Sequence, residues 1–337
     1  MDKNTMHIVY CGDAAYVPAI GVSMTSVIWS NIGRVISFHL LLDNVTKSDM
    51  ERLQAFGNMY RSVAGLQIYR VRPDRPELAL FKQANSTYTP AASYRLLAAS
   101  LLPAEVDRVL YLDGDVICRS PLDALWQTEL GENLAAGVND PLQAMHQQRT
   151  GITDYVNSGV LLIDLAAWRQ ENVTGQILDC FRQHAAELRY PDQDAINRVC
   201  RGRILHLPQK FNYPVSCNFA AAGLPNQLSA DAVLCHFVGP VAKPWFITCL
   251  DPRAALWQQN CDRSFWPDFV LSGTEAMRDE MTAVRRLFED GEEQAAFRRY
   301  RALIRKVDGR FEPVVLRQPG WKIPQPDDAS SSSGGEA

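Results

Sequence analysis

The first 112 residues alternate short apolar runs with longer stretches of helical period, and this alternation limits the chain to few folds. The runs are typical of buried strands because they are apolar along most of their length. The stretches between them carry apolar residues at helical spacing. The expected elements are Met6–Cys11, Tyr16–Trp29, Val35–Leu42, Thr46–Met59 and Leu66–Val71. Right-handed crossovers join units of this length, so we expect an α/β fold with a mainly parallel sheet.

A further expected strand, at residues 108–112, runs directly into Asp113-Gly114-Asp115. Side chains two residues apart in an extended segment point to the same side, so both carboxylates can converge on one cation. Gly114 lets the backbone approach a ligand closely. An isolated Asp-x-Asp pair is usually a solvated turn, but in open α/β sheets ligands bind beyond the carboxyl ends of the strands. The position of the pair therefore favours a metal-diphosphate site.

Other polar side chains follow other expected strands or open a helix. They are Asp13, Asp140, Asp192-Gln193-Asp194 and His236. Carboxylates together with one imidazole favour Mn²⁺ or a similar borderline-hard cation, whereas Mg²⁺ prefers oxygen ligands alone. A lysine close to Gly239 could meet a diphosphate as a point charge.

The composition restricts the partners and the compartment. A chain of 337 residues that is 47% hydrophobic can bury a full core. Its net charge of −4 does not indicate nucleic-acid binding. The eight cysteines form no C-x-x-C pair, and residues 1–5 lack the features of a secretion signal, so we expect a cytoplasmic protein. No run approaches the roughly 18 apolar residues of a membrane span.

The sequence pattern changes after residue 250. We expect one α/β domain over 1–250, a helical and partly basic region over 251–323, and a disordered tail over 324–337. The stretch 295–317 is amphipathic and rich in arginine. Such a stretch is either a solvated helix face or a surface for anionic lipid, where each basic residue contributes about 1 kcal/mol. We expect peripheral association with a membrane through it.

Six ordered motifs resemble those of glycosyltransferase family 8, the retaining nucleotide-sugar transferases that include bacterial lipopolysaccharide glucosyl- and galactosyltransferases. The resemblance covers about residues 6–245 and implies a GT-A-type, Rossmann-like mixed sheet flanked by helices, with a helical C-terminal extension. The motifs are Ile8-Val9-Tyr10-Cys11-Gly12-Asp13, Tyr94-Arg95-Leu96, Tyr111-Leu112-Asp113-Gly114-Asp115, Asn157-Ser158-Gly159-Val160-Leu161-Leu162, Asp192-Gln193-Asp194, and His236-Phe237-Val238-Gly239 with Lys243-Pro244-Trp245.

The resemblance implies four groups of site residues. The Mn²⁺ ligands are Asp113, Asp115 and His236. The uracil is held by Asp13 and the backbone of Cys11, and Tyr16 is a further residue expected to bind the nucleotide. The residues around the donor sugar are Arg95, Asn157, Asp192 and Gln193. The diphosphate contacts are Gly239 and Lys243. A metal and a lysine would stabilise the negative charge that develops on UDP as it leaves.

Retention at the anomeric carbon can follow two routes. A covalent route needs a nucleophile, and the uncharged amide of Gln193 is a poor one. We therefore expect front-face substitution, in which Gln193 stabilises an oxocarbenium-like centre and a UDP phosphate oxygen takes the acceptor proton. Asp192 and Asp140 complete the catalytic set, and a covalent adduct on either of them would contradict this route.

The sequence departs from the family pattern in two places. Ala14-Ala15 replace polar residues, including an asparagine that helps to hold the nucleotide, and the spacer 240–242 is one residue longer than usual. The expected activity is transfer of glucose or galactose from a UDP-sugar to a lipopolysaccharide core at the inner face of a bacterial inner membrane. Two alternatives stay open. One is a metal-dependent nucleotidyltransferase, which usually has a basic Gly-rich loop where residues 11–15 are acidic. The other is a non-catalytic sugar-nucleotide-binding protein.

Overall fold

The computed structural model describes residues 5–72, 74–84, 89–215, 228–239, 243–249, 251–269 and 275–307. The chain divides into two compact units, which we describe separately. The first comprises Met1–Tyr213 and Asp231–His236, and the second comprises Pro214–Ala230 and Phe237–Ala337.

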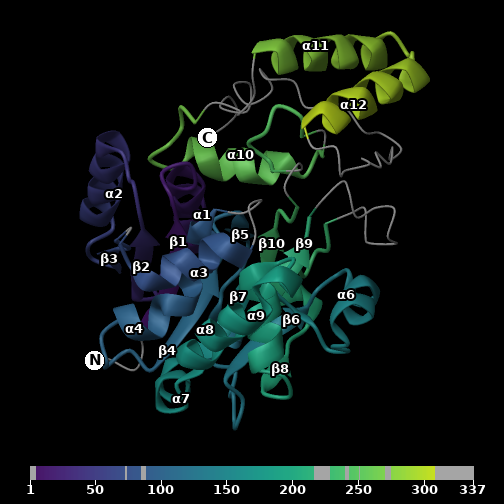
Figure 1. Cartoon of the computed structure of the whole chain (residues 1–337). Coiled ribbons are helices and arrows are strands. Elements are labelled where there is room, and N and C mark those ends of the chain that lie inside the picture. The colour runs from purple at the N-terminus through teal and green to yellow at the C-terminus, as the bar shows by residue number, and fades with distance from the viewer. Residues whose placement is uncertain are drawn as a thin grey trace. The chain divides into compact units, whose positions relative to one another are not determined.

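The first unit is built on a seven-stranded sheet with the order β3-β2-β1-β4-β7-β6-β8 (Figure 1). β7 runs antiparallel to its neighbours β4 and β6, and the other neighbouring strands are parallel. The predicted α/β fold with a mainly parallel, mixed sheet is therefore confirmed. The strands are β1 (Met6–Gly12), β2 (Ile36–Leu42), β3 (Ala64–Arg70), β4 (Arg108–Leu112), β6 (Ala135–Asn139), β7 (Val156–Asp164) and β8 (Ile204–His206).

A second, three-stranded sheet has the order β5-β10-β9. Its strands are β5 (Val116–Cys118), β10 (Leu234–His236) and β9 (Tyr213–Pro214). β5 follows β4 after only three residues, Asp113-Gly114-Asp115, and pairs antiparallel with β10. The predicted acidic pair therefore lies where the chain passes from the large sheet to the small one.

Helices cover both faces of the large sheet. Adjacent strand residues point to opposite faces, and in β1 Val9 and Cys11 join the main core cluster with residues of α7, α8 and α9, whereas the Tyr10 hydroxyl lies 2.9 Å from Ser23 Oγ of α1. The helices are α1 (Val17–Ser30), α2 (Lys47–Met59), α3 (Pro76–Ala84), α4 (Ala98–Leu101), α5 (Asp123–Trp126), α6 (Gln143–Thr150), α7 (Leu165–Gln170), α8 (Val173–His184) and α9 (Pro191–Val199), with 3₁₀ turns η1 (Pro90–Leu97), η2 (Ala185–Glu187) and η3 (Gln209–Asn212).

Sequence reasoning placed most of these elements and misjudged some. The helix expected from Thr46 is present as α2, and Thr46 caps it, since its Oγ1 accepts from the Asp49 amide. The segment that carries the Tyr94-Arg95-Leu96 motif forms the 3₁₀ turn η1, within which Arg95 Nε donates to the Ala92 carbonyl. The pattern missed β5, which has only three residues and is too short to show a period.

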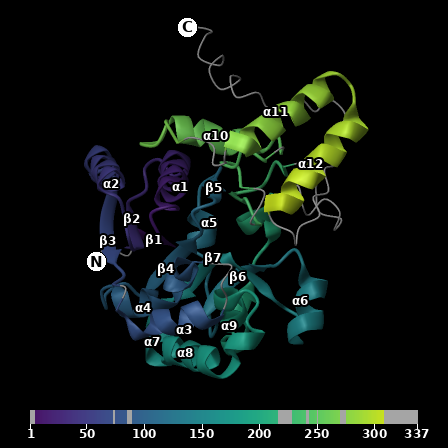
Figure 2. The same ribbon diagram turned by 45° about the horizontal axis from the view of Figure 1, so that its top comes forward.

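The second unit contains α10 (Ala254–Asp262), α11 (Glu275–Glu289) and α12 (Glu293–Val307). α11 and α12 form a hairpin (Figure 2) whose core contains Met281 and Val284 from one helix and Tyr300, Leu303 and Ile304 from the other. The amphipathic helix predicted near 295 is therefore present, but its apolar side is covered by α11. Residues 308–317 of the basic stretch and the expected tail 324–337 lie outside the described residues.

The aromatic residues before this hairpin form a second apolar cluster in the same unit. Trp245 lies 5.4 Å from Trp257 and 6.4 Å from Phe269, measured between ring centroids, and Trp245, Trp257 and Trp266 are buried. These tryptophans are core residues. Across the chain segments that the structure describes, no helix is long and apolar enough to span a membrane.

Candidate functional site

Two short strands bring the imidazole of His236 to the acidic pair. β10 pairs antiparallel with β5 in the register that puts His236 opposite Val116, the residue after Asp115. Two backbone hydrogen bonds hold Asp113 in place. Its amide donates to the Gly159 carbonyl at 2.8 Å, and its carbonyl accepts from the Val116 amide at 3.1 Å. Strand pairing therefore joins residues that are more than 120 positions apart in the sequence.

The three side chains form a compact group. His236 Nε2 lies 3.3 Å from Asp115 Oδ1 and 3.7 Å from Asp113 Oδ2. One ligand atom from each residue lies within 4.8 Å of the other two, and no other set of this kind occurs among the residues with described positions. Asp115 is 2% exposed and His236 is 4% exposed. Two carboxylates this close, one of them buried, repel each other unless a cation offsets their charge.

The donor atoms of these side chains are close enough to bind one metal ion. A Cβ atom at Gly159 would lie 2.2 Å from His236 Cε1 and 2.7 Å from Asp113 Oδ2, so a glycine is required beside the group. Two carboxylate oxygens and one imidazole nitrogen are the donor set of a borderline-hard divalent cation such as Mn²⁺. Asp113, Asp115 and His236 are therefore the residues that could hold such an ion.

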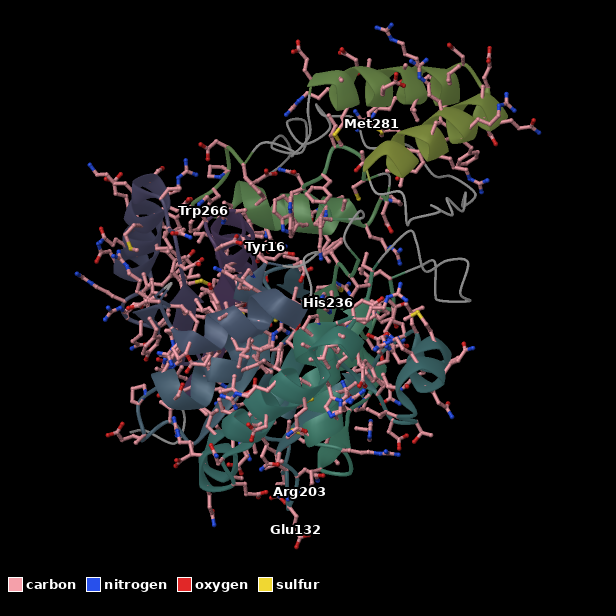
Figure 3. The ribbon with its side chains drawn as sticks, viewed as in Figure 1. Tyr16, Glu132, Arg203, His236, Trp266 and Met281 are labelled. Carbon is pink, nitrogen blue, oxygen red and sulfur yellow. The ribbon has the colours of Figure 1, made fainter. Side chains whose placement is uncertain are left out.

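Gly114 has a packing role as well. A Cβ atom there would lie 2.9 Å from Ile20 Cγ1 and 3.1 Å from Tyr16 Cδ1, so the absence of a side chain lets α1 approach the acidic turn. The Tyr16 hydroxyl forms a hydrogen bond with Asp115. Burial and then the nearby carboxylates raise the pKa of Tyr16 well above its usual value, which keeps the hydroxyl protonated. Tyr16 and His236 are both labelled in Figure 3.

Two side chains hold the Asp113 carboxylate by donating hydrogen bonds to its Oδ1 oxygen. Its Oδ1 accepts from the Tyr111 hydroxyl at 2.6 Å and from Arg95 Nη2 at 2.8 Å. The guanidinium carbon also lies 4.3 Å from the centre of the Tyr111 ring. Both donors engage Oδ1, so Oδ2 is the oxygen that faces His236. Sequence reasoning assigned Tyr111 only to the buried strand and missed this contact.

Arg95 connects two carboxylates of the candidate site. It is 7% exposed, and besides Asp113 its guanidinium contacts Asp192 Oδ2 at 3.2 Å and donates to the Ser158 carbonyl at 2.7 Å. Burial disfavours the charge, but Asp113 and Asp192 outweigh it and raise the pKa of Arg95 well above its usual value. The arginine therefore stays charged and balances the acidic cluster.

A second polar group lies around the start of β7 and contains four of the five residues expected near a donor sugar or its reaction, the fifth being Arg95. Gln193 Oε1 accepts from the Ser158 amide at 3.0 Å, and Gln193 Nε2 donates to Asp140 Oδ2 at 3.2 Å. Asn157 Nδ2 donates to the same Asp140 oxygen at 3.0 Å. Asp192 Oδ2 accepts from Ser158 Oγ at 3.0 Å.

The two carboxylates of this group differ in pKa. Burial raises the pKa of Asp192, and the charge of Arg95 only partly offsets this. Burial also acts on Asp140, but hydrogen bonds from His146 and Asn157 outweigh it, so its pKa is lowered. The surroundings of Asp140 therefore favour its ionised form, whereas burial disfavours the ionised form of Asp192.

The residues expected to contact the nucleotide lie at the end of β1. Cys11 is 6% exposed, and its Sγ lies 3.2 Å from the Tyr111 hydroxyl. Asp13 Oδ1 accepts from the Ala15 amide at 3.1 Å.

The residues expected to bind the diphosphate, Gly239 and Lys243, belong to the second unit. Gly239 has φ = +94°, and Lys243 Nζ donates to the Phe237 carbonyl at 2.9 Å. The spacer 240–242 lies outside the described residues.

Comparisons with known proteins agree on one family. The family model for Glycosyl transferase family 8 matches residues 7–249, which contain all the candidate site residues. The lipopolysaccharide 1,2-glucosyltransferase of Escherichia coli (strain K12) is 27% identical over 274 residues, which are 78% of this chain and 79% of that protein. The lipopolysaccharide 1,3-galactosyltransferase of Salmonella typhimurium (strain LT2) is 26% identical over 281 residues, 80% of this chain and 82% of that protein.

A solved structure extends the likeness to three dimensions. A crystal structure of the galactosyltransferase LgtC, in complex with donor and acceptor sugar analogues, is similar with a TM-score of 0.67 and 26% sequence identity. The match covers 81% of this chain and 99% of that chain. The likeness therefore includes almost the whole of that enzyme.

Proposed function

The chain belongs to glycosyltransferase family 8 and is a glycosyltransferase, and from this premise we propose that it transfers glucose or galactose from a UDP-sugar to a sugar hydroxyl of a lipopolysaccharide core. The observation that carries the proposal is the group of Asp113, Asp115 and His236 at the carboxyl end of β4, in which Asp115 and His236 are buried. Similarity to the lipopolysaccharide glucosyl- and galactosyltransferases supports the acceptor class and the hexose.

The family motifs support the assignment of the donor-site residues. Asp113, Asp115 and His236 would hold Mn²⁺, which when bound supplies positive charge to the diphosphate as UDP leaves. Asp13, Tyr16 and the backbone of Cys11 would bind the nucleotide. Gly239 and Lys243 would bind the diphosphate, the lysine as a point charge.

The sugar side of the site would contain Arg95, Asn157, Asp192, Gln193 and Asp140. Gln193 is held by hydrogen bonds at both ends of its amide, so it can present a fixed dipole but no anionic nucleophile. In the proposed reaction the bond from the anomeric carbon to the UDP oxygen breaks while the acceptor oxygen bonds to the same face. The acceptor proton passes to the departing phosphate oxygen, which balances the transfer. The positive charge of Arg95 would stabilise the ionised carboxylates of Asp113 and Asp192.

The activity is tested by incubating the full chain with Mn²⁺, UDP-glucose or UDP-galactose, and rough-type lipopolysaccharide, with UDP release and labelled hexose as readouts. We expect transfer from one of the donors, and near-complete loss in Asp113→Ala and Asp115→Ala. Asp179→Ala, on the exposed surface of α8, is a matched carboxylate control that should retain activity. UDP binding without transfer or hydrolysis would favour a non-catalytic sugar-nucleotide-binding protein, and nucleotide transfer to a sugar phosphate would favour a nucleotidyltransferase.

We also propose that the α11–α12 hairpin meets an anionic membrane surface through charge alone. Its apolar side is covered within the hairpin, but Arg298, Arg299 and Arg301 are exposed on α12. Each basic residue near such a surface is worth about 1 kcal/mol. Arg298→Glu with Arg301→Glu should lower binding to vesicles containing phosphatidylglycerol by at least roughly 25-fold, and Arg182→Glu on α8 is the matched control. Equal binding by both variants would refute this surface.

A further inference from the structure

A chain of three contacts, two partly buried and one buried, connects the sugar side of the candidate site to His236. Asp140 Oδ2 accepts from Asn157 Nδ2 at 3.0 Å, and Asn157 Oδ1 accepts from Asn212 Nδ2 at 3.0 Å. Asn212 Oδ1 then lies 2.9 Å from His236 Nδ1. Asn212 ends η3 and is 5% exposed. No sequence motif singled it out, although its side chain touches the imidazole of the metal group.

The Asp140 carboxylate sets the direction of these hydrogen bonds. Asp140 Oδ2 also receives Gln193 Nε2, so the carboxylate acts there as an acceptor and Asn157 must turn its amide nitrogen toward it. Asn157 Oδ1 then accepts twice, from the Gly159 amide at 3.0 Å and from Asn212 Nδ2. The only group that Asn212 has left for the imidazole is its carbonyl oxygen, which accepts but cannot donate.

The tautomer of His236 follows from this direction. An acceptor facing Nδ1 requires that Nδ1 carry the proton, so in the neutral ring Nε2 is the nitrogen that keeps its lone pair. Nε2 is the nitrogen that faces Asp115 Oδ1 at 3.3 Å and Asp113 Oδ2 at 3.7 Å. The opposite tautomer would point a proton, instead of a lone pair, at the place where a cation would bind.

We propose that Asn212 is a positioning residue that holds His236 as the Nδ1-protonated tautomer and so prepares Nε2 to bind a divalent cation. The inference rests on the proposed function and deepens its metal site. Hydrogen-bonded partners of metal-binding histidines fix the ring and its tautomer, and their loss typically lowers metal affinity by about 10- to 100-fold. Asn157 supports Asn212 through the same chain of contacts.

The first test is titration of the full-length protein with Mn²⁺ alone, followed by the electron paramagnetic resonance signal of free Mn²⁺. Asn212→Leu removes the acceptor and should weaken Mn²⁺ binding by about 10- to 100-fold. Asn212→Asp keeps an oxygen for Nδ1 and should restore affinity to within about threefold of the wild type. Asn31→Leu is the matched control, because Asn31 is 4% exposed and bonds to Val27 and Leu122 away from the metal group.

The second test reads the tautomer directly in metal-free protein labelled with ¹⁵N-histidine. The signals that disappear in His236→Gln should show a neutral ring protonated at Nδ1, and Asn212→Leu should shift them toward protonation at Nε2. An Nε2-protonated ring in the wild type, or Mn²⁺ affinity in Asn212→Leu equal to that of Asn31→Leu, would overturn the inference. Neither test uses a sugar nucleotide, so an absence of hexose transfer would contradict the proposed function while these measurements still decide the role of Asn212.

Discussion

Replacement of Gly159 by alanine would put one methyl group inside the candidate metal centre. The added Cβ would lie 2.2 Å from His236 Cε1, whereas ordinary van der Waals contact begins at 3.4 Å. The imidazole would therefore have to retreat by about 1.2 Å, the difference between these two distances. Asp113 Oδ2, 2.7 Å from the new atom, would have to move as well. Gly159 lies within β7 and has no positive φ, so the backbone itself tolerates alanine.

The size of the effect follows from how little metal ligands can move. Metal–ligand distances in proteins hold within about 0.2 Å, so a shift of about 1.2 Å removes His236 from coordination. We expect Mn²⁺ affinity to fall by at least roughly tenfold. We expect kcat/KM for the UDP-hexose to fall by about 100-fold, which corresponds to about 3 kcal/mol of lost transition-state stabilisation.

The assay compares Mn²⁺ titration and UDP release in Gly159→Ala with those in a matched strand glycine. Gly65→Ala in β3 is the control, because a Cβ there would lie 3.5 Å from Gln67 Nε2 and 3.7 Å from Ser37 Oγ, both ordinary contacts. Circular dichroism should show both variants folded. Wild-type Mn²⁺ affinity and wild-type kcat/KM in folded Gly159→Ala would refute the reasoning.

Three further predictions concern the support of the site, the metal and the fold. Tyr111→Phe removes one donor to Asp113 Oδ1 and should lower kcat/KM roughly tenfold, about the value of one hydrogen bond to a charged group, with little change in thermal unfolding; an unchanged rate would contradict this. Excess EDTA should abolish hexose transfer, and Mn²⁺ should restore it; full activity in EDTA would contradict a metal requirement. Burial, and then the charge of His7, lowers the pKa of His39 from 6.5 to about 4. The unfolded chain therefore takes up a proton between these values that the folded chain does not, so stability present above pH 6.5 is lost as the pH falls, by about 3 kcal/mol at pH 4. Urea unfolding of the wild type and His39→Gln should show this difference, and parallel pH profiles would contradict it.

The acidic half of the candidate metal group could be predicted from the residues alone. A buried strand that ends in Asp113-Gly114-Asp115 puts two carboxylates on one side of an extended segment at the sheet edge. His236 could be joined to them only through the resemblance to a family. The physical link is the pairing of β5 with β10, and a three-residue strand shows no period that could reveal its partner.

The contacts that orient the site could not be predicted in this way. Tyr111 looks like one more apolar strand residue, and its hydroxyl acquires a role only because the chain brings Asp113 within 2.6 Å of it. Asn212 lies in a short 3₁₀ turn outside every motif. Sequence periodicity reports which side of an element is buried, but it does not report which polar atoms meet there.

The C-terminal region shows the same limit. Periodicity correctly predicted a helix with an apolar side in 295–307. It could not show that α11 covers this side, because the partner of an amphipathic helix depends on tertiary packing. The apolar side is therefore not offered to lipid, and the proposed membrane contact is made through the exposed arginines alone.

The central claim is that Asp113, Asp115 and His236 bind one divalent cation that holds the diphosphate of a sugar nucleotide. Crystals of the full chain grown with MnCl₂ and UDP, measured near the manganese absorption edge, test it most directly. We predict one anomalous peak in contact with Asp113 Oδ2, an Asp115 carboxylate oxygen and His236 Nε2, with the diphosphate of UDP on its open side. UDP bound without manganese, or manganese bound away from these three side chains, would contradict it.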